Sequence, residues 1–262
     1  MKNIRRIAPT MLVLVALTTL SFMAKDGVTL RLKPQQDKTY TITSKANAMT
    51  MMEVQGQTMN MSQVFESKQS FTATKVTENQ CEFETQIDAI KMTISQMGMK
   101  LEYDSEHPEK TSPMLAGQVQ AYEETIKKPV SITYDAMGHL VGDSIDVMQS
   151  QLKDIIIELP KEELTVGSKW TSDKSQSFSD SDFDVTMEYT VTAISKKSVD
   201  VSFTGNVEST EISGTYNGTV SINPKTGLIM NGTTKSNLSM TLNEQDMSIP
   251  MTIVGTSTVE VK

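Results

Sequence analysis

The chain has 262 residues, with 24 basic and 32 acidic side chains, a formal net charge of −8 and one cysteine. This length suffices for one large or two modest domains with a real hydrophobic core. A single cysteine excludes an intramolecular disulfide. The acidic balance argues against nucleic acid and against anionic membrane surfaces as partners.

The first residues have the layout of a secretory signal peptide. Residues 2–6 hold three basic side chains, and an apolar run from Met11 to about Ala24 follows. This run is shorter than the roughly 20 apolar residues of a membrane span. We therefore predict a signal peptide over residues 1–24 and an exported mature protein, periplasmic or secreted, that is not transmembrane. An uncleaved N-terminal anchor is the alternative.

Most of the remaining chain alternates between apolar and polar residues. Alternation places one face of a strand on a core and the other in solvent, which is typical of antiparallel sheets. Short turns such as 77–80 and 223–227 separate the segments, which favours hairpins over βαβ units. The clearest alternating segments are Thr39–Thr43, Ser70–Val76, Cys81–Ile87, Glu188–Ile194 and Ser198–Phe203.

Two segments have helical spacing instead. In the first, apolar residues recur between Leu115 and Ile126, after a Ser112–Pro113 start that suits a helix N-terminus. In the second, an apolar stripe runs over Ile145–Leu159 and ends at Pro160. The sequence therefore predicts an α+β fold that is mainly β, with curved antiparallel sheets and one or two packed helices.

The chain also repeats itself weakly. Val130-Ser-Ile and Val220-Ser-Ile each precede a turn and a further apolar segment. This repeat indicates two related halves. The first β-rich half, with one helix, spans residues 25–143, and a connecting helix and the second β-rich half span residues 144–262.

Leu159-Pro160 followed by Val166-Gly-Ser-Lys-Trp170 resembles a stretch of uncharacterised secreted proteins from Bacteroidota. The Leu32–Tyr40 start, the Met-Xaa-Met hairpins and the closing Val/Thr strands are similar too. The resemblance covers nearly all of the mature chain. It implies an envelope protein and a β-rich fold, and it implies no activity. The general shape is also similar to periplasmic lipoprotein carriers, in which a curved sheet closes around acyl chains.

Eleven of the nineteen methionines gather in three predicted hairpins, over residues 49–61, 92–101 and 238–251. If Gln55-Gly56 is the first turn, Met52 pairs with Met59, and the hairpins present methionine-rich faces. Methionine is flexible and polarisable, so such faces suit a hydrophobic ligand. The candidate ligand-binding residues are Met52, Met59, Met61, Met92, Met99, Met240 and Met251.

Two other interpretations of the methionines stay open. They can fill a core, or they can bind Cu(I), because soft thioethers select soft metals. No histidine lies within the three hairpins, so we predict no metal and no cofactor.

The sequence contains no recognisable catalytic motif. His107 and His139 stand in no metal-ligand or triad spacing, and Cys81 alternates with charged residues like a buried strand position. We therefore expect a non-catalytic envelope protein that binds a hydrophobic or lipid-like molecule. The alternative is a structural or protein-interaction module without a small-molecule ligand, and a hydrolase is third. The sequence does not indicate an oligomeric state.

Overall fold

A computed structural model describes residues 27–54, 56–142, 156–178, 181–208, 212–244 and 247–262. The predicted signal peptide lies outside these residues, and so does the predicted boundary at 143 and 144. No helix in the described segments has both the length and the apolar composition needed to cross a membrane.

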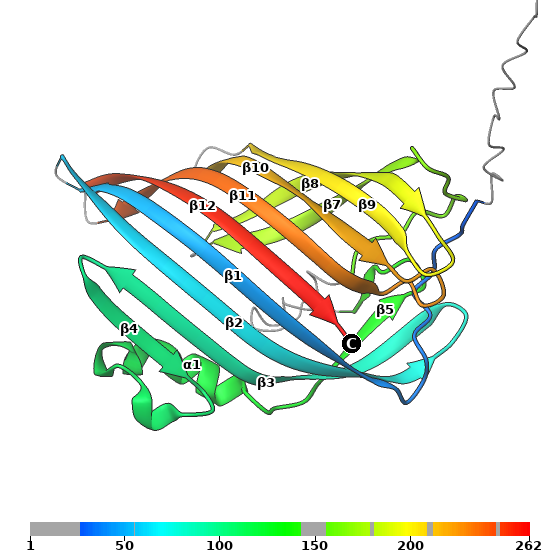
Figure 1. The fold of residues 1–262 in the computed structure, drawn as a ribbon, viewed down its shortest axis with the longest axis horizontal. Helices are drawn as coiled ribbons and strands as arrows, with labels where there is room; N and C mark the ends of the chain where they lie inside the picture. Colours follow the sequence, from blue (N-terminus) through cyan, green and yellow to red (C-terminus); the bar gives the residue numbers. More distant parts are fainter. Residues whose placement is uncertain (1–26, 55, 143–155, 179–180, 209–211, 245–246) are drawn as a thin grey trace, which may run out of the picture.

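The strands form one twelve-stranded antiparallel sheet that curves around a concave inner face (Figure 1). Its order is β6-β5-β3-β2-β1-β12-β11-β10-β9-β8-β7, and β4 also pairs with β3. The strands are β1 (Thr39–Val54), β2 (Gln57–Val76), β3 (Gln80–Gln96), β4 (Met99–Asp104), β5 (Val130–Asp135), β6 (Leu140–Val141), β7 (Lys169–Phe178), β8 (Ser181–Ile194), β9 (Val199–Glu208), β10 (Ile212–Ile222), β11 (Ile229–Glu244) and β12 (Met247–Val261).

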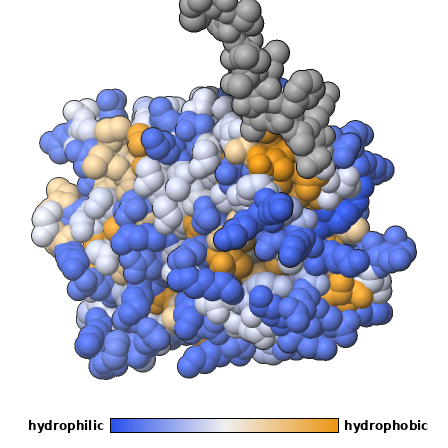
Figure 2. Space-filling model, turned by 45° about the vertical axis from the view of Figure 1, so that its right-hand side comes forward, coloured by the Kyte–Doolittle hydropathy of each residue, from blue (hydrophilic) through white to orange (hydrophobic). Residues whose placement is uncertain are grey.

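The predicted alternation is confirmed along these strands. In β9, Val199, Val201 and Phe203 are buried, whereas Asp200 and Ser202 between them are partly exposed. Apolar inward residues pack on the concave side, and polar residues face water. The visible outer surface is accordingly mostly hydrophilic, with apolar side chains in separate patches (Figure 2).

The first predicted helix is present as α1 (Ala116–Thr125), preceded by the 3₁₀ turns η1 (Pro108–Lys110) and η2 (Pro113–Leu115). Leu115 and Val119 are buried against β3 and β4, in a cluster with Ile90 and Tyr103. The helix therefore covers the inner face at this side of the sheet.

The second predicted helix, Ile145–Leu159, lies mostly outside the described residues. Its described end, residues 156–159, is not helical. Ile156, Ile157 and Leu159 are nevertheless buried, so this described end of the apolar stripe packs on the core. The described residues form a mainly β protein with one short α-helix and one sheet. The α+β class and the plural sheets predicted from sequence are corrected accordingly.

The strands of the two predicted halves meet at a seam between β1 and β12. Strands β1–β6 lie on one side of this seam, and β7–β12 lie on the other. Leu30 packs in a core with strands β8–β12, whereas Ile156 and Leu228 pack in a core with Tyr40 and Phe71. Each side of the sheet thus completes its core with residues from the other part of the chain.

Candidate functional site

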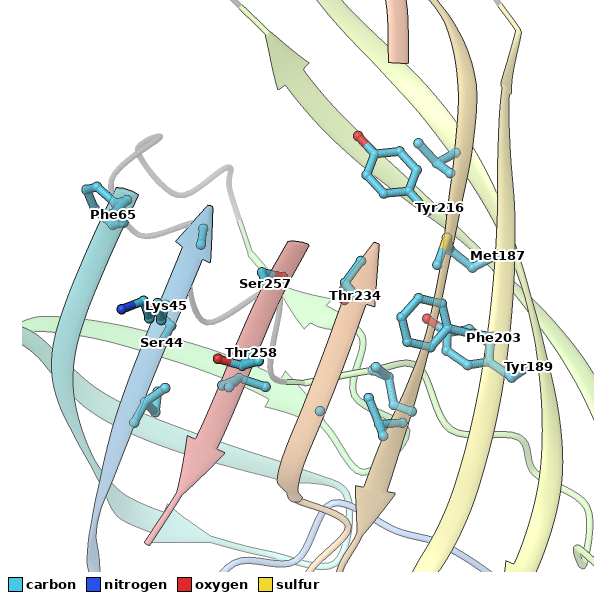
Figure 3. A pocket seen from close by; sticks show the side chains of 17 residues that line it. Ser44, Lys45, Phe65, Met187, Tyr189, Phe203, Tyr216, Thr234, Ser257 and Thr258 are labelled. Carbon is cyan, nitrogen blue, oxygen red and sulfur yellow. The ribbon is translucent and has the colours of Figure 1, made fainter. Parts of the chain in front are cut away.

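A cavity of about 320 Å³ opens on the concave face, between the central strands and the wall formed by β8–β10 (Figure 3). It lies beside the seam, where β1 and β12 pair. The side chains that surround it are mostly apolar, and they come from strands far apart in the sequence.

Small side chains make the floor of this cavity. Ala46 of β1 and Thr234 of β11 both lie directly opposite Ser257 of β12 in the sheet register. Ser44 and Gly232 extend the same floor. Inward positions of a strand are two residues apart, so these four short side chains and one glycine are neighbours on three adjacent strands. They leave a volume that larger residues would fill.

Aromatic side chains and a methionine make the wall. Tyr189 and Phe203 lie with their ring centroids 6.0 Å apart, and Trp170 stacks on Tyr189 at 4.9 Å. Met187 and Tyr216 border the same space, and Phe65 faces it from β2 (Figure 3).

Two glycines let this wall pack closely. A Cβ atom on Gly218 would come 2.5 Å from the ring of Phe203, and one on Gly205 would come 2.3 Å from the sulfur of Met187. Larger residues at these positions would displace the wall, so the glycines help to set the shape of the cavity.

Charge is confined to the outside of the site. Lys45 borders the cavity, but its ammonium group is 2.7 Å from the Glu66 carboxylate, and both side chains are exposed. Figure 3 shows the Lys45 side chain pointing away from the cavity. In the described segments, no three His, Cys, Asp or Glu side chains lie close enough together to hold a metal ion.

The methionines form a row across the sheet near its hairpin ends. Met52 lies directly opposite Met59 on one side and Met251 on the other, and Met251 lies opposite Met240. The pairing of Met52 with Met59 is as predicted. Met240 and Met251 are buried in a core cluster, and Met52 packs against it.

The other predicted methionines are not brought into this row. Met61 is half-buried at the next inward position of β2. Met92 is buried against α1, and Met99 is exposed near the tip of the β3–β4 hairpin. Met52, Met240 and Met251 line a second hollow of about 570 Å³, together with polar residues such as Glu53 and Thr252. A ligand role for the methionines stays a prediction.

Sequence reasoning missed the cavity because its residues are individually unremarkable. The signal is an alternation of small residues, as in Ser44-Xaa-Ala46-Xaa-Ala48 and Gly232-Xaa-Thr234-Xaa-Ser236. This pattern shows that the inward face of a strand carries only small side chains. It does not reveal that several such faces lie next to one another in the sheet.

The structure is similar to several solved structures. A chain described as "Lipid-protein interactions in lipovitellin" is 12% identical with a TM-score of 0.53, over 87% of this chain. Our chain spans only 25% of that one, and the likeness concerns the fold alone.

Two further matches are weaker. The translocator domain of the autotransporter NalP from Neisseria meningitidis is 9% identical, with a TM-score of 0.23, over 86% of this chain and 90% of that one. A putative outer membrane lipoprotein-sorting protein domain from Vibrio parahaemolyticus is 9% identical, with a TM-score of 0.17, over 81% and 83%.

No curated protein matches the chain. A family model matches it over residues 143–229, about a third of its length. The matched segment begins before the second half of the sheet and ends at the first residue of β11. Over residues 143–229 the chain thus resembles DUF6263, a family of unknown function.

Proposed function

We propose that this protein is a non-catalytic, exported envelope protein that binds a hydrophobic or lipid-like molecule in the cavity on its concave face. The observation that carries the proposal is the cavity itself, an apolar space of about 320 Å³ with a small-residue floor and an aromatic wall. Ligand pockets measure roughly 300–1,000 Å³, so this one suits a single small ligand or chain.

The apolar lining supports this proposal. The cavity opens on the concave face, so water can enter it when no ligand is bound. An apolar ligand would remove that lining from water and would gain free energy through burial and dispersion contacts.

The fold gives further support. The lipovitellin structure to which this chain is similar concerns lipid–protein interactions by its own description. A curved antiparallel sheet with an apolar concave face offers a lipid a surface shielded from water. The N-terminal segment supports export, and sequencing the protein from its host should find a first residue between about 22 and 25.

A structural or protein-interaction module is the second candidate. The buried positions of Met240 and Met251 favour it, because these side chains fill a core. The two candidate functions make different predictions for the cavity. Ligand binding requires that a ligand occupy it, whereas a structural or protein-interaction module does not.

Cavity filling tests the proposal. Ala46→Phe places a large side chain on the floor, and should weaken binding of the hydrocarbon dye pyrene at least about tenfold, because ligand and ring compete for one volume. Asn47→Phe is the control, since Asn47 is exposed on the opposite face of β1. Fluorescence titration measures both. Absence of pyrene binding to the unaltered mature protein, or equal binding by the two variants, contradicts the proposal.

A further inference from the structure

We propose that the cavity selects an uncharged ester with an apolar group on each side of its carbonyl, and that the hydroxyls of Ser257 and Thr234 donate to the carbonyl oxygen. This inference rests on the proposed function and names the ligand class of the same cavity. It follows from the place of these two hydroxyls, the hydroxyl pair, on the cavity floor.

The first observation is that the hydroxyl pair belongs to the lining. Ser257 of β12 and Thr234 of β11 both border the cavity, and both residues are partly exposed. They lie directly opposite each other in the sheet register, and Figure 3 shows them on neighbouring strands. A ligand in the cavity therefore contacts them without any rearrangement of the protein.

The second observation is that the hydroxyl pair has hydrogen bonds to offer. The hydroxyl of Ser44, which also borders the cavity, already lies 2.7 Å from that of Ser67. Neither hydroxyl of the pair makes a hydrogen bond with another described residue. Water can bond to them while the cavity is open. A ligand that covers them has to replace these bonds, because a buried hydroxyl without a partner costs free energy.

The third observation is that apolar groups lie on both sides of the hydroxyl pair. In the same row across the sheet, Ala46 lies opposite Ser257, and Gly218 lies opposite Thr234. The next residues of this row are aromatic, Phe65 beside Ala46 and Phe203 beside Gly218. Both rings border the cavity. The hydroxyl pair thus lies between two apolar ends, which suits a ligand whose polar group is internal.

The fourth observation concerns charge. Of the described residues that border the cavity, only Lys45 is charged. Its ammonium group lies 2.7 Å from the Glu66 carboxylate, and its side chain points away from the cavity (Figure 3). An ionised group at the hydroxyl pair would lose hydration without gaining a counter-charge. The polar group of the ligand is therefore uncharged.

An ester meets all of these conditions. Directly opposite residues of a sheet have Cβ atoms about 4.5–5.5 Å apart, so two hydroxyls can converge on one carbonyl oxygen, which has two lone pairs. An ester has acceptors and no donor, and the hydroxyl pair supplies both donors. Because its carbonyl stands inside the chain, the two apolar halves extend toward Phe65 and toward Phe203.

Displacement of pyrene from the mature protein tests this selectivity with hexyl hexanoate, its isomer dodecanoate and the alkane tridecane. At about pH 8, well above the pKa of a carboxyl group, dodecanoate is ionised. Thr234→Val combined with Ser257→Ala removes both hydroxyls with little change of shape. This double variant should weaken hexyl hexanoate binding about tenfold or more, and should leave tridecane and pyrene within about threefold. Each ligand is compared on two proteins, so its own solubility in water cancels.

Thr233→Val combined with Thr256→Ala is the matched control. Thr233 and Thr256 are exposed neighbours of the hydroxyl pair on the opposite face of the same strands. The control should leave all three ligands unchanged. Equal weakening of ester and tridecane by the first double variant, or equal effects of the two double variants, overturns the inference. Weakening of dodecanoate with no effect on the ester overturns it too, in favour of a charged ligand.

Infrared spectroscopy of the unaltered protein gives a second measurement, which decides if the double variant does not fold. The carbonyl stretch of bound hexyl hexanoate should lie at lower frequency than in hexane, because donated hydrogen bonds weaken the carbonyl bond. A frequency equal to that in hexane overturns the inference. In each of these outcomes, pyrene binding still upholds the proposed function, whereas failure of pyrene to bind refutes the proposed function itself.

Discussion

At the scale of single residues, burial of Cys81 in the sheet lowers the reactivity of its thiol. The sequence predicted a buried strand position, and the residue is fully buried with its thiol 3.2 Å from the Leu32 carbonyl. Burial raises the pKa of this thiol from 9.0 to about 11, because the thiolate loses its hydration. The folded protein should therefore resist thiol reagents near neutral pH and react once it is unfolded.

The raised pKa of Cys81 also predicts that the protein becomes less stable as the pH rises. Between about pH 9 and 11 the folded state keeps the Cys81 proton and the unfolded state loses it, so the free energy of unfolding falls as pH rises. The loss should total about 2–3 kcal/mol. Denaturant unfolding of the unaltered protein and of Cys81→Ala over this range measures the difference, and parallel curves would contradict the prediction.

At the scale of elements, residues 156–159 form no helix, but they contribute to stability because their apolar side chains are buried. Ile156 is 5% exposed and packs in the cluster of Tyr40, Phe71 and Phe83. Ile156→Ala should lower the free energy of unfolding by about 2–5 kcal/mol, because it leaves a cavity among rings. Val166→Ala, at an exposed nearby site, should cost less than about 0.5 kcal/mol. A similar loss for both would show that the Ile156 contact is not structural.

At the scale of the whole molecule, the two sides of the sheet should unfold together. Leu30 lies in the core of the second side, and the Arg31 guanidinium donates to the carbonyls of Pro160 and Lys161 at 3.1 and 3.0 Å. β1 and β12 also pair along most of their lengths. Separation of the sides would therefore expose both cores at once, which favours one cooperative transition.

Two local probes check this cooperativity. Trp170 fluorescence reports on the second side, and the accessibility of Cys81 to a thiol reagent reports on the first. Their denaturant midpoints should coincide. Midpoints separated by more than the experimental error would show that the sides fold as independent units.

The sequence by itself determined the strands, the first helix and the faces of the methionine hairpins. These are local properties: alternation fixes which side of a strand is inward, and the short connection between Val54 and Gln57, which pair with each other, brings Met52 opposite Met59. Only the tertiary structure decided that β1 pairs with β12, which joins both halves in one sheet. The cavity depends on that pairing, because Ala46, Ser257 and Thr234 become neighbours only across three strands. Side-chain spacing along a strand does not encode which distant strand will lie beside it.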